Sequence, residues 1–256
     1  MNFPTRARTA LLGCLAACGA LPLASHAQST DIPPGWAVGL GVAAIKKPYA
    51  GYGTDKIVFP TLSYESERFR FVGTTADWKF ANYGSLSFAL RGRYSLGDGY
   101  SASDAAVFSG MHDRKAGFWL GGAVTYKSDL VRVSAEFLGD VSDYSKGQQA
   151  RVDVAHDFRV GEFTLTPHVA ATYEDKKYVG YYYGVGQDEA TAGRPAYQGA
   201  STVNYQAGLR TTYLLGSRQI LFLDLGATAL GKEIRNSPLV SQKTMPTLAV
   251  GYLYRF

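Results

Sequence analysis

The chain has 256 residues, and its 26 Lys and Arg against 21 Asp and Glu give a formal net charge of +5 at pH 7. Aromatic residues make up 13% of the chain and there are 29 Gly, a combination that favours strands and tight turns. The mean hydropathy is −0.10, and no run of 18 apolar residues occurs beyond the N-terminus, which argues against a membrane-spanning helix. The basic residues are scattered along an exported chain, so no nucleic-acid partner is expected.

The first 27 residues have the organisation of a bacterial secretory signal peptide. Arg6 and Arg8 give a basic start, and residues 9–24 form an apolar stretch. Residues 25–27, Ser-His-Ala, place small side chains at the two positions that signal peptidase reads. We therefore predict export and cleavage after this segment.

A second processing signal lies inside the first. Residues 15–18, Leu-Ala-Ala-Cys, are similar to a lipobox, which would leave a lipidated Cys18. Cleavage after Ala27 is favoured because the apolar stretch continues past Cys18 to a good cleavage site. The predicted mature domain, 28–256, then contains no cysteine, which excludes disulfides and thiolate metal sites.

Beyond the signal, side-chain character alternates with a period of two. Residues 203–213, for example, place Val, Tyr, Ala and Leu on one face and Asn, Gln and Arg on the other. This alternation predicts strands at 36–45, 57–64, 68–80, 86–95, 116–127, 130–138, 150–158, 163–173, 203–213, 219–229 and 245–256.

Three features of these segments favour a membrane barrel over a soluble sandwich. The segments are about ten residues long, which is the length that a tilted strand needs to cross a bilayer. Aromatic residues recur at their ends, as in interfacial girdles. The less apolar face carries charges in mid-strand, which a dry core would not tolerate unpaired. The sequence therefore predicts an all-β, antiparallel transmembrane barrel in the bacterial outer membrane, in contact with lipid and lipopolysaccharide.

The strand count and the connections set the topology. Eleven candidate strands are one short of an even number, so we expect twelve strands, with ten as the alternative. Residues 96–115 are the suspect region, because they could conceal a strand or form a long loop. The short turns at 159–162 and 215–218 are expected in the periplasm, and the long loops at 174–201 and 230–244 outside.

The last predicted strand is expected to close the barrel against the first. One face of 245–256 is wholly apolar. Its end is similar to the signal that the barrel assembly machinery recognises, which typically runs polar, any, Gly, any, any, aromatic, any, aromatic. Gly251, Tyr254 and Phe256 match that pattern, whereas Ala249 stands where a polar residue is usual.

Charged residues should line the barrel interior if the apolar faces meet lipid. The predicted network, with six arginines and four carboxylates, consists of Arg91, Arg93, Arg132, Glu136, Arg151, Asp153, Asp157, Arg210, Asp224 and Arg255. Cross-strand ion pairs would fill a small barrel. We expect almost no conduction, and an anion preference in any narrow path because positive charge is in excess.

Catalytic and metal-binding patterns are weak. His112, His156 and His168 lack metal-ligand spacing, and no cofactor is expected. Ser109 or Asp113 near His112 is the only local candidate for an outer-membrane hydrolase, and closeness in a loop is no preorganised triad. We therefore predict a non-enzymatic protein.

Two loop stretches carry a family resemblance. Residues 48–51 read Pro-Tyr-Ala-Gly, and residues 182–197 read YYGVGQDEATAGRPAY. Together with the hairpin YESERFRF at 64–71 and the aromatic end, their order and spacing resemble the MipA/OmpV family of outer-membrane proteins. The family-like positions are Pro48, Tyr49, Gly51, Tyr182, Tyr183, Gly184, Val185, Glu189, Ala190, Arg194 and Tyr197.

The resemblance implies a scaffold that links a lytic murein transglycosylase to a bifunctional, penicillin-binding murein synthase. Other family members are described as adhesins or porin-like proteins, and these remain alternatives. No ligand-binding role for single residues is implied. The loop block is equally compatible with a structural lid, in which tyrosines pack together and Asp188 or Glu189 pairs with Arg194.

Overall fold

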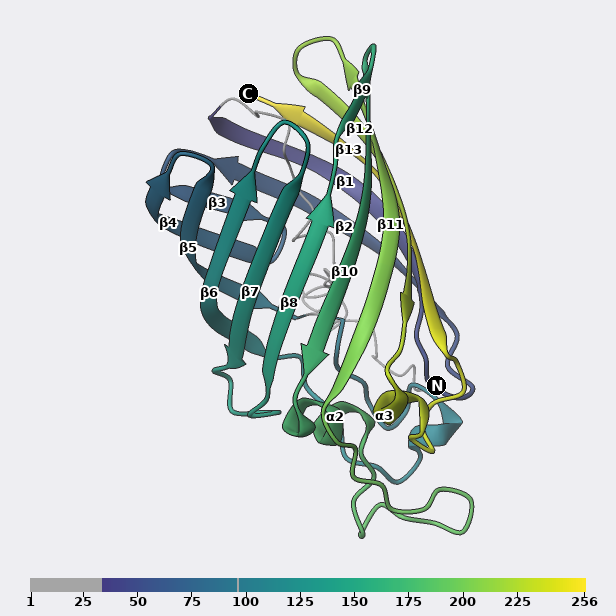
Figure 1. Ribbon diagram of the computed structural model, residues 1–256. Helices are drawn as coiled ribbons and strands as arrows, with labels where there is room; N and C mark the ends of the chain where they lie inside the picture. Colours follow the sequence, from purple (N-terminus) through teal and green to yellow (C-terminus); the bar gives the residue numbers. More distant parts are fainter. Residues whose placement is uncertain (1–33, 96) are drawn as a thin grey trace, which may run out of the picture.

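The computed structural model describes residues 34–95 and 97–256, which form one antiparallel sheet closed into a barrel (Figure 1). The predicted signal peptide, including Cys18, lies outside the described residues. The strands are β1 (Gly35–Lys46), β2 (Thr54–Glu65), β3 (Phe69–Val72), β4 (Thr75–Tyr83), β5 (Leu86–Tyr94), β6 (Phe118–Lys127), β7 (Arg132–Asp140), β8 (Gln148–Ala155), β9 (Phe158–Val160), β10 (Phe163–Glu174), β11 (Thr202–Leu215), β12 (Gln219–Ala229) and β13 (Thr244–Arg255).

Two pairings show how the sheet closes. β13 pairs with β1 from Thr247 to Arg255, and β10 pairs with β11 along its whole length. β8 and β9 both pair with β10 and are two pieces of one strand, interrupted opposite Pro167, whose ring removes a ladder donor. Over the described ranges the barrel therefore has 12 strands, as predicted.

The strand missing from the sequence count is not in 96–115. The predicted strand 68–80 is two strands, β3 and β4, joined by a tight turn at Gly73 with φ of 58°. A positive φ suits glycine, which explains why the chain reverses there. The described residues of 96–115 form a loop with a short 3₁₀ helix, η1 (Ala106–Phe108).

The outer wall of the barrel is apolar and aromatic. Alternate residues of β1 are exposed, including Leu40 at 64%, while Ala43 on the opposite face is buried. Aromatic pairs lie near strand ends, such as Trp36 with Tyr64, whose ring centroids are 4.7 Å apart. In water such a surface would aggregate, whereas a bilayer covers it. This face confirms the predicted outer-membrane location.

The two ends of the barrel differ in the size of their connections. The end that holds Trp36 and Phe256 has short turns, and the other end carries the long loops (Figure 1). The long-loop end also contains α2 (Lys176–Tyr183) and α3 (Lys232–Arg235). Residues 97–115 pack with these long loops and so lie at the end opposite both strand termini. No helix among the described residues is long and apolar enough to cross a membrane.

Candidate functional site

Arg91 lies near the centre of an ion network inside the barrel. Its Nε and Nη2 donate to the two carboxylate oxygens of Asp77 at 2.7 Å each, and its Nη1 donates to Glu136 Oε2 at 2.5 Å. Asp77 is its direct cross-strand partner on β4. All three side chains are buried. Arg91 on β5 therefore makes charge-assisted hydrogen bonds to two carboxylates, one on β4 and one on β7.

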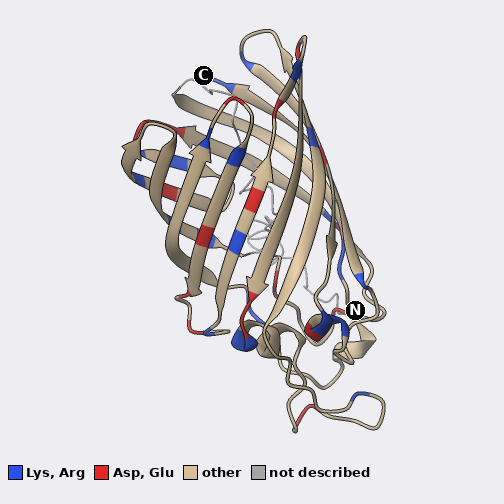
Figure 2. Cartoon of the chain, in the orientation of Figure 1, with Lys and Arg blue, Asp and Glu red and all other residues tan. Residues whose placement is uncertain are grey.

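This contact continues in both directions around the wall. On one side, Glu136 Oε1 accepts from Arg93 Nη1 at 2.7 Å, and Arg93 Nη2 donates to Gln149 at 2.8 Å. On the other side, Arg70 lies 3.7 Å from Asp77 and 3.5 Å from Glu65, which also pairs with Lys79. We call the whole set of lumen ion pairs the charge belt; Figure 2 shows charged residues partway along several strands.

Other predicted lumen residues form separate pairs in the charge belt. Arg210 and Asp224 face each other across β11 and β12, with nitrogen–oxygen distances of 2.6 and 2.8 Å. The remaining pairs are Arg132 with Asp157 at 3.6 Å, Arg151 with Asp153 at 3.5 Å and His168 with Asp153 at 3.7 Å. Arg255 lies half-buried at the last position of β13, at the terminal end of the barrel.

Sequence analysis missed several members of the charge belt. Glu65, Arg70, Asp77 and Lys79 flank the unrecognised turn at Gly73, which hid the alternation of β3 and β4. Glu174, at the end of β10, lies outside the charge belt but is also a buried acid of the inner face. The structure thus adds three acids and two bases to the predicted set, which reduces the positive excess behind the expected anion preference.

The long loops fold into a plug with its own aromatic core. Tyr49 stacks on Tyr183 with ring centroids 5.6 Å apart, and its hydroxyl donates to the Tyr182 carbonyl at 3.3 Å. Phe108 is fully buried and stacks on Tyr100 at 3.9 Å. The family-like stretches 48–51 and 182–197 thus contact each other, although Tyr49 and Tyr182 are 133 positions apart in the sequence. We call this loop cluster the plug.

Several family-like residues shape the plug backbone. Pro48 lies fully buried, and its carbonyl accepts from Ser241 N at 2.9 Å. Gly51 has a φ of 70° in the turn between β1 and β2. Val185 bridges to Tyr197, whose hydroxyl donates to the Glu233 carbonyl at 2.6 Å. The remaining residues of this set are Gly184, whose N donates to the Gly180 carbonyl and caps α2, and Ala190, which packs against the aromatic core.

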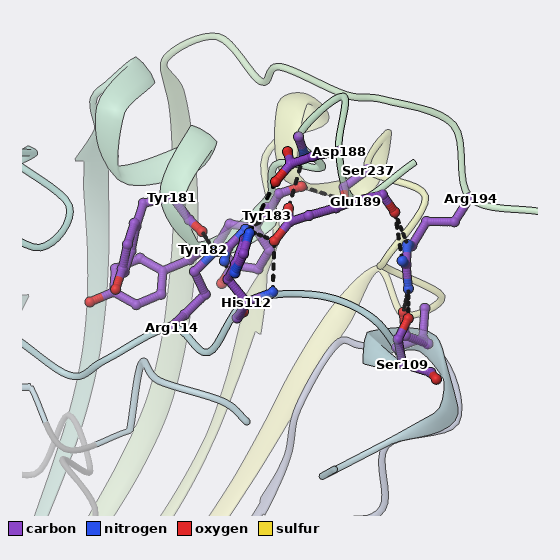
Figure 3. Close-up of polar contacts among 12 residues, drawn as sticks. Ser109, His112, Arg114, Tyr181, Tyr182, Tyr183, Asp188, Glu189, Arg194 and Ser237 are labelled. Atoms are coloured by element: carbon purple, nitrogen blue, oxygen red, sulfur yellow. Dashed lines mark hydrogen bonds and ion pairs between the residues drawn. The ribbon is translucent and has the colours of Figure 1, made fainter. Parts of the chain in front are cut away.

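Glu189 is the polar centre of the plug (Figure 3). Arg114 Nη2 donates to its Oε2 and Oε1 at 2.7 and 2.9 Å, and the backbone N–H groups of His112 and Gly186 donate at 2.9 Å each. Burial opposes ionisation, but these donors outweigh it and lower the pKa of Glu189 below its ordinary value. A charged Glu189 therefore joins the β5–β6 and β10–β11 loops.

The expected pairing of Arg194 with Asp188 or Glu189 is wrong. Arg194 donates instead to backbone carbonyls, at 2.6 Å to Val107, 3.0 Å to Ser109 and 2.6 Å to Glu189 (Figure 3). The Glu189 carboxylate instead accepts hydrogen bonds from Arg114, which lies in the β5–β6 loop. Arg194 therefore holds η1 in position by donating to backbone carbonyls, rather than by pairing with a carboxylate.

The hydrolase alternative has no assembled triad. His112 Nε2 lies 3.0 Å from Asp188 Oδ2, and both side chains are at least 70% exposed. That contact lowers the pKa of Asp188. Within the described ranges, the Ser109 side chain donates no hydrogen bond to His112, and Asp113 accepts from Ser101 and Ala102. No group of His, Cys, Asp or Glu among the described residues could hold a metal ion.

Comparison with known proteins assigns this architecture to a family. The sequence model described as MltA-interacting protein MipA matches residues 38–256. The chain belongs to the MipA family. It is 25% identical over 239 residues to YiaT of Escherichia coli (strain K12), covering 93% of this chain and 96% of that protein. It is 30% identical over 190 residues to outer membrane protein OmpV of Vibrio cholerae, covering 73% and 70%.

Proposed function

We propose that this MipA-family barrel is a closed, non-enzymatic anchor that holds a murein-processing enzyme at the outer membrane. The observation that carries the proposal is the filling of the lumen, by the charge belt along its wall and by the plug at one end. A barrel narrowed at two levels is poorly suited to be an open pore. The family's description as an MltA-interacting protein supports a murein hydrolase of the lytic transglycosylase kind as the partner. A murein synthase, which the sequence resemblance implies, is the further member of the proposal.

The end with short turns offers one surface for such a partner. The β9–β10 and β11–β12 hairpins rise beyond the neighbouring turns (Figure 1). Val160 is 62% exposed and Leu215 is 45% exposed at these hairpins. Short turns and both strand termini belong on the periplasmic side of such barrels. The two hairpins therefore supply an apolar periplasmic contact, although the turns themselves are short.

A binding assay with purified lytic murein transglycosylase tests this role. The unmodified protein in detergent should bind the enzyme, and the double variant Val160→Glu/Leu215→Glu should bind at least about tenfold more weakly, because charges at an apolar contact must be desolvated. Asp143→Lys, an exposed change at the long-loop end, should leave binding unchanged. No binding by the unmodified protein, or equal binding by the double variant, would contradict the proposal.

A further inference from the structure

A chamber lies between the charge belt and the plug. Its volume is about 200 Å³. Tyr178 and Tyr183 of α2 line the plug side, and Arg93 and Arg151 line the belt side. A space this small is below the roughly 300–1,000 Å³ typical of sites for drug-sized ligands. Any occupant must therefore be compact.

Glu174 is the unsatisfied group of this chamber. Its side chain lines the cavity and is 7% exposed, and its Oε2 has no hydrogen-bond partner among the described residues. The Asn204 amide is its one side-chain donor. No ion pair within the described ranges reaches Glu174, so its carboxyl group has no paired cation. A buried carboxylate in that condition is unfavourable unless a cation approaches.

The neighbouring charged groups form no ion pair with Glu174 within the described ranges. Asp98, a second carboxylate, also lines the chamber and repels it. Arg93 is already bonded to Glu136 and Gln149, and Arg151 donates to Thr172 and Gln206. The Glu174 wall of the chamber therefore holds two carboxyl groups, although arginines outnumber acids in the predicted lumen set.

The remaining lining favours an organic cation over an inorganic one. The aromatic side chains of Tyr178 and Tyr183 line the chamber, where aromatic rings can attract ammonium groups, and Leu230 and Met245 add apolar surface. The described carboxylates do not form a cluster of three that could hold a metal ion. Charge and apolar surface thus lie on adjacent walls of one small cavity.

We propose that the chamber binds a small organic cation, with its ammonium group at Glu174 and Asp98 and its carbon skeleton against Tyr178 and Tyr183. This inference is independent of the periplasmic partner, because the chamber lies inside the barrel and the two hairpins lie at its far end. Failure of one proposal therefore leaves the other standing.

Titration calorimetry of the refolded full-length barrel in detergent tests the chamber. Choline and butane-1,4-diamine are the probes, and matched additions of sodium chloride correct for ionic strength. We expect saturable binding of at least one probe, reduced at least tenfold in Glu174→Gln, which keeps shape and hydrogen-bonding capacity but removes charge. Asp188→Asn, an exposed acid outside the chamber, should bind as the unmodified protein does.

Two checks keep the result interpretable. Heat-modifiable gel mobility must show that Glu174→Gln is folded, and Tyr183→Phe, which retains the ring, should keep the affinity within about threefold. Binding of neither probe would overturn the proposal. Equal binding by Glu174→Gln would also overturn it, because the carboxylate would then play no part.

Discussion

Replacing Arg91 by alanine should destabilise the barrel by about 3–5 kcal/mol, because Asp77 and Glu136 would be left buried without their shared cation. The loss should appear as a lower urea midpoint for the conversion of the heat-modifiable gel band in detergent. The effect is expected to be large because three hydrogen bonds at 2.5 to 2.7 Å disappear together.

The double variant Arg91→Ala/Arg93→Ala should also widen the lumen beside β5, and should open a conductance leak once Phe108→Ala has loosened the plug. Arg159→Ala, an exposed arginine on β9, is the matched control and should change neither the midpoint nor the conductance. An unaltered midpoint in Arg91→Ala would show that the charge belt does not stabilise the fold.

Replacing Phe108 by alanine should loosen the plug without unfolding the barrel. Phe108 is fully buried and packs on Tyr49 and Tyr100 at 4.9 and 3.9 Å between ring centroids. Removing a buried phenylalanine ring typically costs about 3–5 kcal/mol. That loss falls on loops with few strand contacts, so limited proteolysis should cut within 97–115 at least tenfold faster.

The control for this experiment is Val141→Ala, an apolar residue that is 60% exposed in the β7–β8 loop. It should leave the cleavage rate unchanged. The urea midpoint of the barrel should stay the same in both variants, because strand pairing does not involve Phe108. Slow cleavage in Phe108→Ala would mean that the plug is held by its polar contacts alone.

The strand pattern of this protein could be predicted because lipid imposes it. Each strand must present apolar residues at every second position, so segments such as 163–173 and 203–213 match β10 and β11 closely. The prediction of a single strand at 68–80 was wrong, because a two-residue turn at Gly73 preserves the apparent alternation while it reverses the chain. Local periodicity cannot distinguish one long strand from two short ones joined so tightly.

The plug could not be predicted in the same way, because its contacts are set by the closed barrel. Arg114 and Glu189 are 75 residues apart, and only the circular strand order places their loops side by side. Sequence analysis offered Asp188 or Glu189 as the partner of Arg194, because nearness in sequence was the sole available guide. The tyrosines of the plug could be recognised in the sequence as a cluster, whereas the contribution of Phe108, which packs against Tyr49 and Tyr100, could not.

The most direct test of the closed-barrel account is planar-bilayer recording of the unmodified protein. The charge belt and the plug predict almost no current at neutral pH, against clear steps from the Arg91→Ala/Arg93→Ala/Phe108→Ala variant in the same membrane. Large, cation-selective steps from the unmodified protein would contradict the account and identify an open channel.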